Sequence, residues 1–96
     1  MLINATIQVV PLLGTPASFP VIDNAIALIQ QSGVKYSVGA FETTLEGEYE
    51  TVQALIKQVC DFCYAQKEVQ FLLYTKYHLS GGTDILAENK TAKFNQ

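Results

Sequence analysis

The chain has 96 residues, of which 49% are hydrophobic and only 16% are charged. This length supports a single domain with a small core, and the thin charged surface indicates that another subunit covers part of it. The net charge is −3 and arginine is absent, which excludes the basic surface of a nucleic-acid-binding protein. This composition therefore favours a neutral or cationic partner over an anionic one.

The sequence carries no targeting or membrane pattern that we can identify. The first residues run directly into a patterned segment without the charged and apolar regions of a signal peptide. No run approaches the roughly 18 apolar residues that cross a bilayer. We therefore expect a cytoplasmic protein that does not bind membranes, with both cysteines reduced.

Hydrophobic periodicity predicts four strands and two helices. Alternation of apolar and polar residues predicts strands, at residues 3–11, 34–41, 43–48 and 69–79. Apolar residues at helical spacing predict helices, at residues 19–32 and 49–66. Ser18 is the expected N-cap of the first helix, and Pro20 fits its first turn.

The element order βαββαβ predicts a specific fold. With right-handed crossovers it gives an α+β, ferredoxin-like sandwich. We expect an antiparallel sheet of strand order 4-1-3-2 with both helices on one face. Residues 1–80 form this domain, and residues 81–96 are a C-terminal tail that either forms one short helix or frays.

The helix-free face of the predicted sheet is the candidate functional surface. Apolar side chains lie among its polar ones, which suits a dimer interface enclosing a polar pocket. Its polar members include Asn4, Thr6, Gln8, Ser37, Thr44, Glu46, Tyr74, Lys76 and His78, and its apolar members include Val10, Phe41 and Leu72.

Two segments resemble the small thiamine-binding protein family. These are Tyr36-Ser37-Val38-Gly39-Ala40-Phe41 and Thr44-Leu45-Glu46-Gly47-Glu48, and the opening Ile7-Gln8-Val9-Val10-Pro11-Leu12 is similar as well. The resemblance covers residues 3 to about 79, and the tail departs from it. It implies a ferredoxin-like homodimer or homotetramer that binds thiamine or its hydroxymethylpyrimidine moiety near the sheet face. It implies neither an enzyme nor a bound cofactor.

Glu46 is the central candidate for a ligand contact. A carboxylate can pair with the ring nitrogen and the exocyclic amine of an aminopyrimidine, and it complements a thiazolium cation. Gln8, Ser37 and Thr44 would add polar contacts, and Phe41 and Tyr74 would form apolar walls. The alternative is that residues 42–50 form a solvated hairpin edge and an acidic helix start, and that the two aromatic residues pack in a dimer.

The remaining motifs have simple structural explanations. Cys60 and Cys63 fall well inside a predicted helix, which favours buried, inert thiols over a redox or zinc site. His78 ends a strand next to a glycine turn, as expected of a surface or interface histidine. No nucleophile–base pair stands at readable spacing. We therefore expect a non-catalytic small-molecule-binding protein, with a ligand-free assembly module and a small enzyme as the alternatives.

Overall fold

The computed structural model describes residues 1–12, 15–66 and 69–94, and it contains the expected four-stranded sheet. The strands are β1 (Leu2–Pro11), β2 (Lys35–Val38), β3 (Thr43–Glu48) and β4 (Phe71–His78). They pair antiparallel in the order β2-β3-β1-β4, which confirms the predicted topology.

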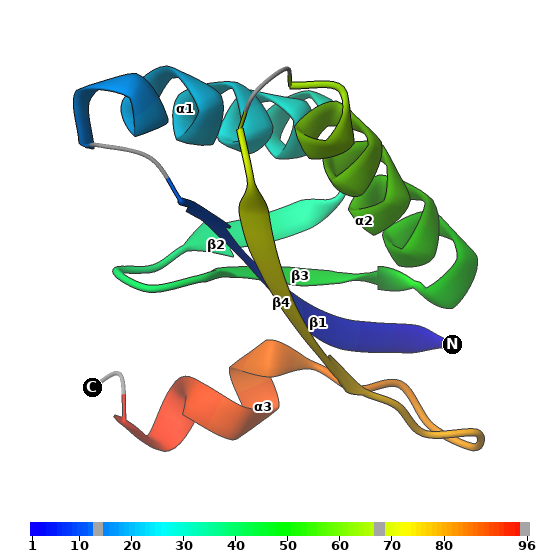
Figure 1. Ribbon diagram of the computed structural model, residues 1–96. Helices are drawn as coiled ribbons and strands as arrows, with labels where there is room; N and C mark the ends of the chain where they lie inside the picture. Colours follow the sequence, from blue (N-terminus) through cyan, green and yellow to red (C-terminus); the bar gives the residue numbers. More distant parts are fainter. Residues whose placement is uncertain (13–14, 67–68, 95–96) are drawn as a thin grey trace.

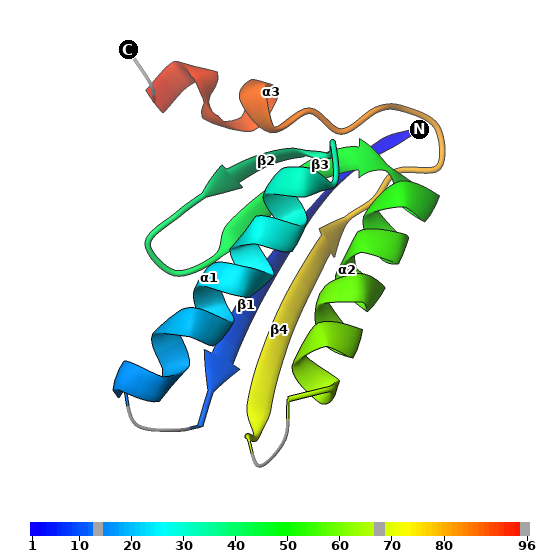
Figure 2. The same ribbon diagram turned by 90° about the horizontal axis from the view of Figure 1, so that it is seen from above.

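The two long helices cover one face of this sheet (Figures 1 and 2). They are α1 (Thr15–Gln31) and α2 (Tyr49–Tyr64). The core lies between them and the sheet, and it is centred on Leu45 of β3 and on Val52 and Val59 of α2, none of which has measurable exposure. Ile3, Ala5 and Ile7 of β1 join it, as their alternation predicted.

The first helix begins earlier than the sequence pattern indicated. It starts at Thr15, so Ser18 lies within the helix rather than at its cap, and Pro20 lies inside it. Pro16 instead occupies the first turn, where the missing N–H of proline does no harm. The prediction of a Ser18 cap is therefore wrong, because the helix already includes the three residues before Ser18.

The second strand is shorter than predicted. It ends at Val38, and the Gly39 N–H then donates to the carbonyl of Glu42 at 2.9 Å, which closes a tight turn. A Cβ atom on Gly39 would lie only 2.9 Å from that carbonyl oxygen, so the turn requires glycine. Phe41 consequently lies in the turn and not on the strand that residues 34–41 were expected to form.

The C-terminal tail forms a short helix and packs against the sheet. After β4 the chain crosses to the face opposite α1 and α2, where α3 (Ala87–Thr91) and the 3₁₀ turn Ala92–Phe94 lie (Figure 1). Two contacts attach the tail to the start of β1: the Ile85 N–H donates to the Leu2 carbonyl at 2.9 Å, and Asp84 Oδ1 accepts from the Leu2 N–H at 2.7 Å. The helix-free sheet face is therefore partly covered by the chain itself.

No helix within the described ranges is both long enough and apolar enough to cross a membrane.

Candidate functional site

The strand register places the polar side chains of the helix-free face in rows across the sheet. The first row runs from β2 to β4 through Lys35, Glu46, Asn4 and His78, and the second runs through Ser37, Thr44, Thr6 and Lys76. Gln8 and Tyr74 pair in a third row on β1 and β4. Five of the six predicted site residues therefore share this face.

Phe41 is the exception among the predicted site residues. Its side chain is 84% exposed, and it borders a cavity of about 270 Å³ formed with α1 residues such as Ile22 and Ile26. That cavity lies on the helix side of the sheet edge, away from Glu46. The expectation that Phe41 and Glu46 share one pocket is wrong, because the strand alternation stops at the Gly39 turn.

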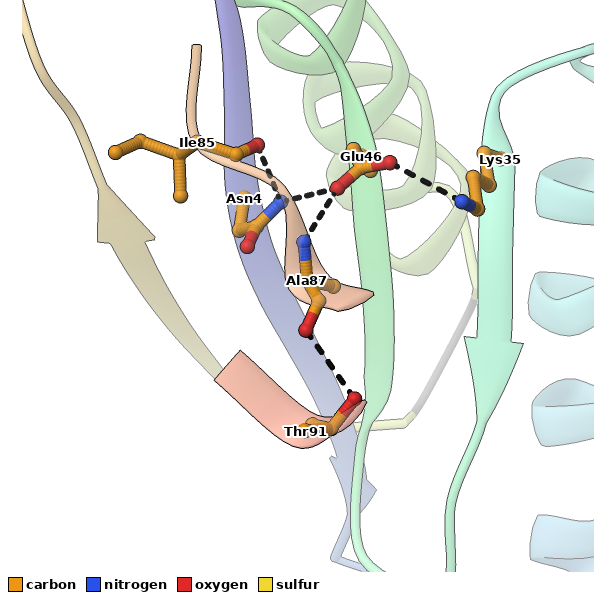
Figure 3. A network of polar contacts seen from close by, with 6 residues as sticks. All are labelled: Asn4, Lys35, Glu46, Ile85, Ala87 and Thr91. Atoms are coloured by element: carbon orange, nitrogen blue, oxygen red, sulfur yellow. Dashed lines mark hydrogen bonds and ion pairs between the residues drawn. The ribbon is translucent and has the colours of Figure 1, made fainter. Parts of the chain in front are cut away.

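Glu46 is buried beneath the tail rather than open to a ligand. Its residue exposure is only 9%, and both carboxylate oxygens have partners (Figure 3). Oε1 accepts from the Ala87 N–H at 2.6 Å and from Asn4 Nδ2 at 3.0 Å, while Oε2 lies 3.3 Å from Lys35 Nζ. Glu46 therefore joins β1, β2 and the start of α3.

These contacts explain the protonation behaviour of Glu46. The hydrogen bond from the Ala87 N–H lowers the pKa of this carboxyl group most, burial opposes it by raising the pKa, and Asn4 and Lys35 lower it further. The net result is a pKa below the ordinary value. Glu46 is therefore ionised at neutral pH, and its charge is directed at the tail and Lys35.

The neighbours of Asn4 fix the orientation of its side-chain amide. One amide group faces two acceptors, Glu46 Oε1 at 3.0 Å and the Ile85 carbonyl at 3.2 Å, so it must be the NH₂ group. The amide oxygen Oδ1 therefore points the other way (Figure 3). Asn4 is 4% exposed, yet Oδ1 has no hydrogen-bond partner in the described part of the chain.

A cavity of about 380 Å³ lies between the sheet and α3, directly beside Asn4. The strands β1, β3 and β4 form its floor and α3 forms its opposite wall. Its lining residues are Asn4, Ala5, Thr6, Thr44, Lys76, Tyr77, His78, Ala87, Lys90 and Thr91. Thr6 Oγ1 is a second buried polar atom in this lining without a hydrogen-bond partner among the residues described. This cavity is the candidate ligand site.

The cavity includes only one of the predicted site residues, Thr44. Gln8 and Tyr74 line a neighbouring hollow of about 500 Å³. Glu42 and Lys76 also line it, and Lys76 Nζ lies 3.1 Å from Glu42 Oε1. Ser37 is exposed on the edge strand β2, where it pairs with Thr44 of β3.

Three residues of the cavity, Asn4, Thr6 and Lys90, were not among the predicted site residues. Asn4 and Thr6 were recognisable only as polar positions of a strand, and Lys90 gave no signal because it lies in the tail.

The other reactive side chains that the structure describes are two cysteines outside this cavity and His78, which lines it. Cys60 and Cys63 are free thiols on α2, and burial raises the pKa of each. His78 Nδ1 lies 2.8 Å from Lys90 Nζ. Within the described ranges, no group of three or more His, Cys, Asp or Glu residues is arranged to hold a metal ion.

Comparisons with known proteins match this chain over nearly its full length. The sequence profile described as "Thiamine-binding protein" matches residues 5–95. A UPF0045 protein of Clostridium perfringens is 25% identical over 91 residues, which is 95% of each chain.

Solved structures agree with this match. A domain of unknown function, DUF77, from Bacillus cereus is 34% identical with a TM-score of 0.88, over 99% of this chain and 91% of that one. A candidate thiamine biosynthesis or salvage protein of Thermotoga maritima is 31% identical with a TM-score of 0.87, over 99% of this chain and 100% of that one.

Proposed function

This chain belongs to the thiamine-binding protein family, and we propose that it binds thiamine or its hydroxymethylpyrimidine moiety without catalysing a reaction. The proposed site is the cavity between the sheet and α3. The protein would then act as a carrier, buffer or sensor of the vitamin or its precursor.

The proposal is carried by the amide oxygen of Asn4, which is buried and has no hydrogen-bond partner among the described residues. A buried acceptor without a donor costs about 1–3 kcal/mol, and Asn4 cannot avoid this cost by turning its amide, because Glu46 and Ile85 hold the NH₂ group. An aminopyrimidine offers an exocyclic amine as donor and ring nitrogens as acceptors. Asn4 Oδ1 could accept from the amine, and the Thr6 hydroxyl could donate to a ring nitrogen.

This arrangement changes the role that we assign to Glu46. Both of its oxygens are already paired, so we propose that it positions the ligand site by holding Asn4 and the start of α3. Thr44 would contact the ligand from the cavity floor. Gln8, Ser37 and Tyr74 lie on the same face at its margin, where they would contact a longer ligand or a second subunit.

The absence of catalysis is also part of the proposal. In the described residues, His78 pairs with Lys90 and with no hydroxyl or thiol group. The Thr91 hydroxyl donates to the Ala87 carbonyl at 3.2 Å. The arrangement that activates a nucleophile, in which a base lies within hydrogen-bond reach of it, does not occur among these contacts.

Isothermal titration with thiamine and with hydroxymethylpyrimidine tests the proposal. The decisive variant is Thr6→Val, which removes a hydroxyl group that no described residue pairs with and keeps the side-chain shape. We expect the unliganded protein to be as stable as the wild type or more so, since an unpaired buried polar atom is removed. Affinity should fall about fivefold or more, because a ligand contact is lost.

Thr51→Val is the matched control, because Thr51 lies exposed on α2, which packs on the opposite face of the sheet. It should leave both ligand affinities unchanged. If neither ligand binds the wild type, the proposal fails and a ligand-free assembly module becomes the better explanation. If both bind but Thr6→Val binds equally well, the ligand lies elsewhere on the protein.

A further inference from the structure

The cavity beside α3 carries an uneven distribution of charge. Three basic side chains contribute to its lining, Lys76 and His78 from β4 and Lys90 from α3, whereas none of its lining residues is Asp or Glu. Lys76 is partly neutralised by Glu42 at 3.1 Å. Lys90 forms no ion pair with any described residue, and its hydrogen-bond partner is an imidazole nitrogen of His78.

The contact between Lys90 and His78 determines what the imidazole can offer. An ammonium group only donates hydrogen bonds, so His78 Nδ1 must accept at 2.8 Å. The proton of a neutral imidazole then resides on Nε2, which can donate a hydrogen bond. Lys90 retains further N–H groups because an ammonium carries three. The two side chains together therefore present several donors and one net positive charge.

Among the described residues, the carboxylate of Glu46 pairs with Lys35 and not with Lys90 or His78. Its Oε1 is directed at Ala87 and Asn4, and its Oε2 at Lys35 on the far side of β3 from β4. The cavity is thus polarised, with the Asn4 amide oxygen and the Thr6 hydroxyl, both unpaired among the described residues, on β1 and cationic donors on β4 and α3. A matching ligand carries donors on one side and an anionic group on the other.

We propose that the site prefers a phosphorylated aminopyrimidine, such as the phosphate ester of hydroxymethylpyrimidine, to the unphosphorylated alcohol and to free thiamine. This inference rests on the proposed function, because it assumes that the aminopyrimidine occupies the same cavity. The phosphate would lie against Lys90, His78 and Lys76, where charge-assisted hydrogen bonds are strong. The thiazolium cation of free thiamine would face the same positive groups and be disfavoured.

The charges close to the cavity matter more for this ligand than the net charge of the whole chain. The acidic chain without arginine favoured a neutral or cationic partner, but a ligand responds chiefly to charges within roughly a Debye length, about 8–10 Å at ordinary ionic strength. Two of the six lysines line this one cavity. Lysine binds phosphate as a point charge, so the planar fork of arginine is not required.

Titrations with four probes test the preference: hydroxymethylpyrimidine, its phosphate ester, thiamine and inorganic phosphate. We expect the ester to bind the wild type about tenfold tighter than the alcohol or more, with an advantage that shrinks at high salt. Lys90→Gln should abolish most of that advantage, and Lys90→Arg should retain it. Lys57→Gln is the matched control, because Lys57 is an exposed lysine of α2 that pairs with Asp61 at 2.7 Å.

The outcomes separate the two proposals. If the alcohol binds as tightly as the ester, or if Lys90→Gln and Lys57→Gln keep the same ratio, the phosphate preference is refuted while the proposed function stands. If inorganic phosphate binds as tightly as the ester, the site recognises an anion without the pyrimidine, and the preference is again refuted. If none of the organic probes binds, both proposals fail. Amide exchange at Ala87 should be unchanged in Lys90→Gln, which checks that α3 stays docked.

Discussion

Replacement of Glu46 by glutamine tests whether this carboxylate attaches the tail to the sheet. The change keeps the size of the side chain and one oxygen acceptor, but it removes the negative charge. The Ala87 N–H and the Asn4 amide would then donate to a neutral oxygen, and Lys35 would lose its ionic partner. We expect α3 to detach more often from the sheet, while the core beneath α1 and α2 stays intact.

The size of the effect follows from the contacts. A hydrogen bond to a charged group contributes about 1 kcal/mol more than a neutral one. The hydrogen bonds from Ala87 and Asn4 would therefore together stabilise the docked tail by about 2 kcal/mol less. The ion pair adds about 0.5 kcal/mol or less, because the Lys35 side chain is 66% exposed. A neutral amide is easier to bury than a carboxylate, which returns part of the loss. The net cost is about 1–2 kcal/mol.

Amide hydrogen exchange measures this cost at the tail itself. A loss of about 1–2 kcal/mol raises the opening equilibrium about five- to thirtyfold, so exchange at Ala87 and Ile85 should accelerate by that factor. The amide of Val59, in the core of α2, serves as an internal reference that should change little. Exchange reports such local opening separately from global unfolding.

Glu48→Gln is the matched control for this measurement. It makes the same chemical change on the same strand, but Glu48 is exposed and pairs with the terminal ammonium of Met1 at 2.7 Å instead of with the tail. Equal protection of Ala87 in the two variants would refute the assignment of Glu46 as the tail anchor. It would also remove the positioning role that the proposed function gives to this residue.

Two further predictions concern the fold that carries the site. Leu45→Ala should lower the free energy of unfolding, measured in urea, by about 2–5 kcal/mol, because Leu45 has no exposed surface. A loss below about 1 kcal/mol would contradict its central place in the core. Gly39→Ala should lower the same free energy by about 1–3 kcal/mol, because the new Cβ would lie 2.9 Å from the Glu42 carbonyl oxygen. Gly81→Ala is the control and should have little effect, because a Cβ there meets nothing within 4 Å.

The sequence predicts the sheet well because strand alternation and helical spacing are local signals. Ile3, Ala5 and Ile7 alternate with polar neighbours on β1, and all three are in the core. Handedness rules then leave few topologies for the order βαββαβ. The same alternation fails at Phe41, because periodicity alone continues past Gly39 although the chain turns there.

The candidate site was harder to predict because it depends on contacts between distant segments. Glu46 is charged and follows a polar pattern, so it was expected to face a ligand or solvent. It is buried because the tail packs over it, where the Ala87 N–H, 41 residues later in the chain, donates a hydrogen bond to its carboxylate. The orientation of Asn4 in turn requires knowledge of both Glu46 and the Ile85 carbonyl. Neither contact leaves a periodic trace in the sequence.

The pH dependence of tail docking follows from the same contacts. The pKa of Glu46 is lowered when the tail is docked, chiefly by the Ala87 N–H, so a proton binds the open form more tightly than the closed form. The stabilisation is therefore complete above the ordinary glutamate pKa and is lost as the pH falls through the lowered value. We expect opening at Ala87 to increase with acidity in the wild type and much less in Glu46→Gln. A wild-type profile that matches the variant would show that the charge of Glu46 does not hold the tail.

The N-terminus should respond in the opposite direction. Its ammonium has a raised pKa, first because of the hydrogen bond to Glu48 and also through Coulomb attraction to that carboxylate. This contribution is complete below the ordinary amino-terminal pKa and is lost as the pH rises through the raised value. The Leu2 N–H, next to Met1, donates to Asp84 Oδ1, so the opening equilibrium at Leu2 should rise at alkaline pH in the wild type and much less in Glu48→Gln. Opening at Ala87, which Glu46 holds, should change little over the same range.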